Sequence, residues 1–93
     1  MTAVPASWSA TLHVRARSER TAEMLERSLR PEADREVPRA RATLRRSAPD
    51  TVELAIAADD TGAMRAALNT YLGWVALSLG TLRSAREAAR SMD

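Results

Sequence analysis

The 93-residue chain contains no cysteine, no lysine and no phenylalanine, and its aromatic side chains are limited to Trp8, Tyr71 and Trp74. The absence of cysteine excludes a disulfide framework and a thiolate metal site, which fits a reducing cytosolic compartment. The first residues lack the charged and apolar regions of a signal peptide. Residues 66–82 lie at the lower length limit of a membrane span and include polar residues and glycines. We therefore expect a soluble cytoplasmic protein without a membrane partner.

The expected hydrophobic core is small. Hydrophobic residues make up 45% of the chain, but nineteen of them are alanines, whose burial removes little apolar surface from water. A small chain with little core often gains stability by oligomerisation. We expect one domain over residues 8–87, a flexible N-terminus over residues 1–7 and a frayed C-terminus over residues 88–93.

All fourteen basic residues are arginines, and the net charge is only +2. The planar guanidinium suits phosphate and carboxylate recognition. A GC-rich genome would produce the same bias towards arginine and alanine. Composition alone does not choose between these two interpretations.

The hydrophobic pattern predicts three strands and two helices. Residues 8–16 alternate strictly between apolar and polar, which is typical of a half-buried strand. Ser18 is expected to cap a helix that runs through Leu29 and is stopped by Pro31. Two alternating segments, residues 39–46 and 51–57, flank a turn and form a hairpin. Asp59 or Asp60 is expected to cap a last helix that runs to about Arg90.

This order, β-α-β-β-α, indicates an α+β fold. The most apolar strand, residues 51–57, is expected in the centre of a three-stranded antiparallel sheet. Both helices would cover one face, as in split βαβ arrangements. The last helix is much longer than the strands, so its C-terminal half should project past them.

The last helix is apolar around most of its circumference. A seam from Met64 through Leu68, Tyr71 and Val75 continues towards the C-terminus, and further apolar residues lie beside it. A three-stranded sheet covers only a stripe about 100° wide. The surplus apolar surface therefore predicts an interface with another chain.

No residue pattern points to catalysis, a cofactor or a metal. His13 lies on the polar side of its strand, and the Asp59–Asp60 pair is better explained by helix capping than by acid–base chemistry. Metal-ligand spacings and phosphate-binding glycine loops are missing from the sequence. We expect a protein that is not an enzyme and has no cofactor.

An arginine stripe is expected on the second strand, where Arg39, Arg41 and Arg45 would project from one face. Such a stripe is able to contact the phosphates of RNA. A charged edge strand that deters aggregation would have the same pattern. Both interpretations stay open at this level.

The run 58-ADDTGAMRAALNTYLGWVALS-78, with its RAALN-(S/T)-YL-x-W core, resembles the small dimerisation subunit of the KEOPS complex. The resemblance covers roughly residues 8–83. It implies a non-catalytic homodimer that binds the sugar-kinase-like transferase subunit of KEOPS through helices. The assembled complex installs threonylcarbamoyl on the adenosine next to the anticodon of tRNA.

The resemblance also implies which residues face partners. The positions that match the motif or continue its surface are Met64, Leu68, Asn69, Tyr71, Leu72, Trp74, Val75 and Leu79. Arg39, Arg41, Arg45 and Arg65 are candidates for tRNA contact within the assembled complex. Gly73 departs from the bulkier or polar residue expected between Leu72 and Trp74. Asn69 is either an exposed polar position or a hydrogen-bonding residue of the interface.

Two other interpretations use the same residues. A free-standing RNA-binding module would rely on the arginine stripe, although the chain has no GxxG clamp and no aromatic platform beside the stripe. A generic homodimeric adaptor would use the apolar helix with an unrelated partner.

Overall fold

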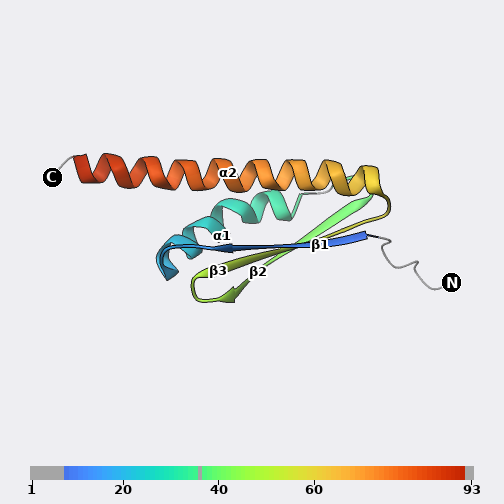
Figure 1. The fold of residues 1–93 in the computed structure, drawn as a ribbon, viewed down its shortest axis with the longest axis horizontal. Coiled ribbons are helices and arrows are strands. Elements are labelled where there is room, and N and C mark those ends of the chain that lie inside the picture. Colours follow the sequence, from blue (N-terminus) through green and yellow to red (C-terminus); the bar gives the residue numbers. More distant parts are fainter. Residues whose placement is uncertain (1–7, 36, 92–93) are drawn as a thin grey trace.

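Two helices lie across one face of a three-stranded sheet (Figure 1). The computed structural model describes residues 8–35 and 37–91. The elements are β1 (Trp8–Arg15), α1 (Glu19–Ala33), β2 (Ala40–Ala48), β3 (Thr51–Ala58) and α2 (Thr61–Ser91). The sheet order is β1-β3-β2, and both strand pairs are antiparallel. The predicted α+β fold is confirmed.

The central strand β3 supplies the most deeply buried part of the sheet. Its residues alternate between buried and partly exposed, and Val52, Leu54, Ile56 and Ala58 form the buried side. Leu54 pairs with Leu12 on β1 and with Leu44 on β2, so one register places apolar residues in line across all three strands. The period of two along each strand produces this common apolar face.

Helix α1 begins where the sequence predicts and ends later. The Ser18 side chain accepts a hydrogen bond from the Thr21 backbone N–H at 3.1 Å, which caps the helix. The prediction that Pro31 stops the helix is wrong, because the helix continues to Ala33. A proline in the last turn removes one backbone donor, and burial of Ala33 at 6% exposure favours continuation.

Helix α2 is capped by Asp60, one of the two aspartates predicted for this role, and is longer than the strands of the sheet. Asp60 Oδ1 accepts a hydrogen bond from the Ala63 backbone N–H at 2.8 Å, as an N-cap does. The 31 residues of α2 span roughly 46 Å, whereas the strands have only eight or nine residues. The C-terminal half therefore extends past the sheet, as predicted, and the molecule is 61 Å long (Figure 1).

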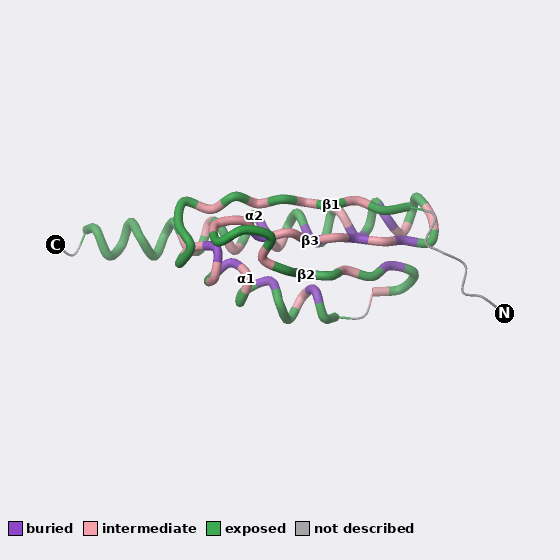
Figure 2. Tube along the Cα trace, turned by 90° about the horizontal axis from the view of Figure 1, so that it is seen from below, coloured by how far each residue is buried: buried purple, intermediate pink, exposed green. Residues whose placement is uncertain are grey.

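The sheet is covered unevenly. Seen from below, α2 runs between β1 on one side and α1 on the other (Figure 2). The core-facing residues of β2 and β3 include fully buried side chains, whereas Ala10, Leu12 and Val14 of β1 stay half-buried. The edge strand β1 therefore keeps an apolar strip that the chain's own helices do not fully cover.

The expectation of a flexible segment over residues 1–7 lies outside the described residues, as do residues 92–93. Helix α2 continues through Ser91, and fraying after residue 87 stays a prediction. Within residues 8–35 and 37–91, no helix has the combination of length and apolar character that crossing a bilayer requires.

Candidate interaction surfaces

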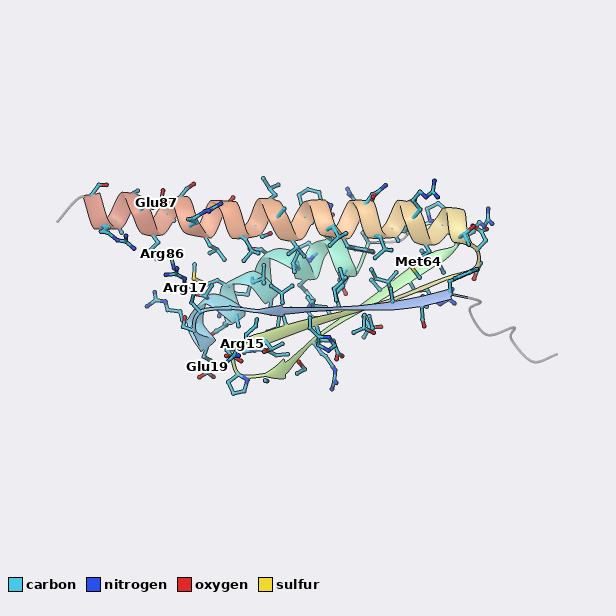
Figure 3. The ribbon with its side chains drawn as sticks, viewed as in Figure 1. Arg15, Arg17, Glu19, Met64, Arg86 and Glu87 are labelled. Carbon is cyan, nitrogen blue, oxygen red and sulfur yellow. The ribbon has the colours of Figure 1, made fainter. Side chains whose placement is uncertain are left out.

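The predicted partner-facing residues of α2 divide into a buried and an exposed set. Met64, Tyr71 and Val75 are at most 8% exposed, and Met64 points from α2 toward the sheet (Figure 3). Their side chains belong to the chain's own core. Leu68 and Trp74 pack partly against that core and keep part of their surface free.

The exposed set provides an apolar surface on α2. Leu72 is 50% exposed, Leu77 is 59% exposed and Leu79 is 36% exposed, while Asn69 also lies at the surface. Leu72 and Leu79 lie two turns apart on one side of the helix, whereas Leu77 lies on another side. Exposed apolar side chains such as Leu72 and Leu79 are typical of an interaction site. The pattern predicted surplus apolar surface, but the sheet's position was needed to tell which residues carry it.

Sequence reasoning missed the contribution of β1. Its strict alternation predicted a half-buried strand but not how far the helices cover its inner face, whose residues are half-buried; Trp8 is 49% exposed. Because β1 pairs with β3 on one side only, its other edge also presents unpaired backbone groups. A signal was available in the short helix α1, since two helices of unequal length cannot cover three strands evenly.

The predicted arginine stripe is largely compensated by carboxylates. Arg45 Nε donates to Glu53 Oε2 at 2.5 Å, and His13 Nε2 lies 3.0 Å from the Oε1 atom of the same glutamate. The hydrogen bond from Arg45 holds the pKa of Glu53 below its ordinary value, with a smaller contribution from His13. The same carboxylate raises the pKa of Arg45.

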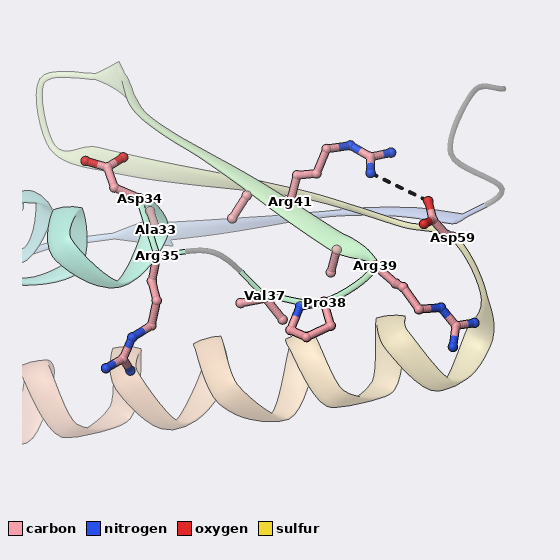
Figure 4. A pocket seen from close by; sticks show the side chains of 10 residues that line it. Ala33, Asp34, Arg35, Val37, Pro38, Arg39, Arg41 and Asp59 are labelled. Carbon is pink, nitrogen blue, oxygen red and sulfur yellow. Dashed lines mark ion pairs between the residues drawn. The ribbon is translucent and has the colours of Figure 1, made fainter. Parts of the chain in front are cut away.

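Arg39 and Arg41 meet the two aspartates that precede α2. Arg41 lies 3.5 Å from Asp59 (Figure 4), and Arg39 pairs with Asp60. Arg39 does not lie on β2 as predicted. It occupies a turn with φ of 64°, in which the Ala40 N–H donates to the Val37 carbonyl at 3.2 Å. The turn aims its side chain towards the start of α2.

The hollow beside this turn has a volume of about 740 Å³ and is open to solvent. It is lined by the end of α1, the Val37–Arg39 turn and the beginning of β2 (Figure 4). Arg35 at its edge pairs with Glu32 at 3.4 Å. Nearby carboxylates therefore neutralise most of the arginine charge around the hollow. This weakens the attraction of the hollow for phosphate.

Arg65 differs from the other three tRNA candidates. It is exposed in the second turn of α2, and it makes no ion pair with a carboxylate in the described part of the chain. The structure thus does not bring the four predicted tRNA residues together as one uncompensated patch. Arg39, Arg41 and Arg45 lie near β2, and each has an acidic partner contributed by β3 or the segment after it.

A small α+β protein whose longest helix carries exposed leucines, and whose edge strand is incompletely covered, has the features of a protein-interaction subunit. A family model described as "Transcription factor Pcc1" matches residues 9–83. The chain belongs to this family, which is that of the small KEOPS subunits. No curated protein matches the chain. The resemblance drawn from the RAALNTYLGW run is thereby confirmed, and family membership supports a KEOPS-associated role.

Proposed function

We propose that this chain is a non-catalytic scaffold subunit of KEOPS. It forms a homodimer in the cytoplasm and binds the sugar-kinase-like transferase subunit through α2. In that position it supports threonylcarbamoyladenosine formation in tRNA. The family membership supports a KEOPS-associated role, and the surface of α2 supports the scaffold assignment.

The observation that carries this proposal is the exposure of Leu72 and Leu79, which lie beside the stripe of α2 that the core already covers. Fully burying a leucine side chain is worth about 1.5–3 kcal/mol, so a partner that covers these residues gains stability from the contact. The half-buried strip of Leu12 and Val14 offers a second apolar surface for a second partner or a second copy. Two surfaces are what a chain needs to join a homodimer to a transferase.

The test is size-exclusion chromatography with light scattering on the protein alone and on its mixture with the transferase from the same genome. The double variant Leu72→Asp with Leu79→Asp is compared with wild type. Both side chains are exposed, so circular dichroism should show an intact fold. Thr70→Asp with Ser84→Asp is the matched control, because it adds the same charge at exposed, polar positions of the same helix that are not partner-facing candidates.

A wild-type dimer that joins the transferase, together with a double aspartate variant that stays separate, is the expected result. Joint elution of the Leu72→Asp, Leu79→Asp variant with the transferase would remove these residues from the interface. A wild-type chain that ignores the transferase would contradict the scaffold proposal itself.

The proposal also includes a contact with tRNA, which is limited to the assembled complex. Arg39, Arg41, Arg45 and Arg65 would contact tRNA only within the assembled complex, because three of them already have carboxylate partners. The same pairs argue against a free-standing RNA-binding module. Arg65→Glu should lower the tRNA affinity of the complex and reduce the slope of that affinity against salt. Unchanged affinity and slope would exclude Arg65 from the contact.

A further inference from the structure

Four arginines without a local partner gather at the projecting end of the molecule. Arg17, Arg20, Arg83 and Arg86 make no ion pair with a carboxylate of residues 8–35 or 37–91. All four line one groove. Arg15 also borders this groove, but it pairs with Asp50 at 3.1 Å.

The groove lies beneath the part of α2 that extends past the sheet. Its walls are the turn after β1, the first turns of α1 and the C-terminal half of α2, and its volume is about 840 Å³. Figure 3 shows Arg86 on α2 and Arg17 on the turn across from it. The groove is therefore bordered by basic side chains that come from two separate segments.

The floor of the groove is apolar. It is formed by Met24 from α1 and by Leu79, Leu82 and Ala85 from α2. Met24 is 41% exposed and Leu79 is 36% exposed, so both side chains have surface left to bury. Methionine adapts its shape to different partners and is common at surfaces that accept several sequences.

The carboxylates of residues 8–35 and 37–91 do not pair with the four arginines that form the rim of this groove. Figure 3 places Glu87 on the outer side of α2 and Glu19 on the far side of the turn from Arg86. On α1, Glu23 and Glu26 are already paired with Arg27 and Arg30. A second copy of the chain would bring the same arginines and the same paired acids, so charge disfavours it as the occupant.

We propose that this groove binds an acidic amphipathic helix of a protein partner, with the apolar stripe of that helix on Met24 and Leu82 and its carboxylates on Arg17, Arg20, Arg83 and Arg86. Such a helix contacts both the apolar floor of the groove and the arginines of its rim. Nucleic acid would match the rim alone and leave the apolar floor without a contact. The groove is distinct from the exposed Leu72 surface, and Leu79 borders both.

The probe is a synthetic helical peptide of about 16 residues, long enough to hold a helix in water, with a leucine seam flanked by glutamates. Backbone amide spectra of the labelled full chain are recorded during titration. We expect shifts at groove positions such as Thr21, Met24 and Ala85. Arg86→Glu should weaken binding about fivefold, because reversing one exposed charge replaces an attraction with a repulsion of similar size.

Arg65→Glu is the matched control, since it makes the same charge change at an exposed position of the same helix away from the groove. Its affinity for the peptide should equal that of wild type. Met24→Gln, which keeps helix propensity and removes apolar surface, should also weaken binding.

The proposal is overturned if the peptide shifts no groove amide, or if a peptide with lysines in place of glutamates binds equally well. It is also overturned if an oligouridine shifts the same amides more strongly than the acidic peptide, since the groove would then be a nucleic-acid site. Equal binding by Arg86→Glu and Arg65→Glu would remove the arginine rim from recognition.

Discussion

Glu53 and Arg45 lie directly opposite each other on β3 and β2, and their side chains meet at 2.5 Å on the solvent side of the sheet. His13 faces the same glutamate from β1, also in register. One acid on the central strand thus serves a basic residue on each neighbour. The three-strand register converts what the sequence presents as a cationic edge into a largely balanced surface.

Removing the Glu53 carboxylate should make stability less dependent on acid pH. The folded-state pKa of Glu53 is lowered, so its contribution is present above the unfolded-state value of about 4.3 and is lost as pH falls through the folded-state value. Urea unfolding of wild type and Glu53→Gln should differ most at neutral pH and converge in acid. Glu87→Gln, on α2 far from the sheet, serves as the control. A constant difference at all pH values would contradict the role of this carboxylate.

Ionisation of Tyr71 should lower the stability of the fold at alkaline pH. Burial raises the pKa of its hydroxyl, and Glu32 adds to the effect, so its contribution is complete below about pH 10 and is lost as pH rises through the folded-state value. The chain has no lysine or cysteine and only this tyrosine, which leaves few groups to confuse the titration. Tyr71→Phe should lose less stability above pH 10 than wild type. An identical alkaline profile would exclude Tyr71.

The size of the Tyr71 side chain should matter at neutral pH. It is 2% exposed and is the largest fully buried side chain. Tyr71→Ala should cost about 3–5 kcal/mol in the free energy of unfolding, as truncation of a buried aromatic residue does. Tyr71→Phe, which keeps the volume, should cost less than about 1.5 kcal/mol. Similar losses in both variants would mean that the hydroxyl, not the packing, carries the effect.

Pro31→Ala should stabilise α1. The proline lies inside the last turn and is exposed, so alanine restores a backbone donor to the Arg27 carbonyl without a new contact. The gain should be about 1 kcal/mol, less than the roughly 3 kcal/mol of a helix interior. This corresponds to a rise in Tm of about 4–8 °C. A lower Tm would show that the proline fixes the chain path into the following segment.

Substitutions of Gly73 and Gly80, two glycines in the interior of α2, distinguish helix stability from partner binding. A Cβ at Gly73 or Gly80 would meet nothing within 4 Å. Each change to alanine should therefore stabilise the isolated chain by about 0.5–1 kcal/mol in chemical unfolding. If the transferase packs closely on Gly73, next to Leu72, Gly73→Ala should also weaken that complex. A destabilised Gly80→Ala chain would contradict an open environment at that position.

The turn before β2 should be sensitive to the residue at position 39. Arg39 has φ of 64°, a region that asparagine tolerates and β-branched residues avoid. Arg39→Val should cost about 1–2 kcal/mol more than Arg39→Asn in urea unfolding, since both variants lose the same ion pair with Asp60. Equal costs would show that the turn relaxes to a negative φ.

The local rules of the sequence predicted much of the architecture. Alternation identified the strands, Ser18 and Asp60 marked the helix starts, and the apolar character of residues 51–57 placed that strand in the centre. The predicted helix end at Pro31 was wrong, because the burial of Ala33 outweighs the local preference against proline in a helix. The RAALNTYLGW run correctly indicated the family.

The sequence by itself determined the elements, their order and the excess of apolar residues on α2, because these depend on periodicity and capping within one segment. Only the tertiary structure decided which of those residues stay exposed. It buried Met64, Tyr71 and Val75 and left Leu72 and Leu79 free. It also brought Glu53, Asp59 and Asp60 to the arginines near β2, while Arg17 and Arg86 line one groove without an ion pair to any carboxylate that the structure describes. Packing and long-range charge pairing join residues that are distant in the chain, and no local pattern encodes them.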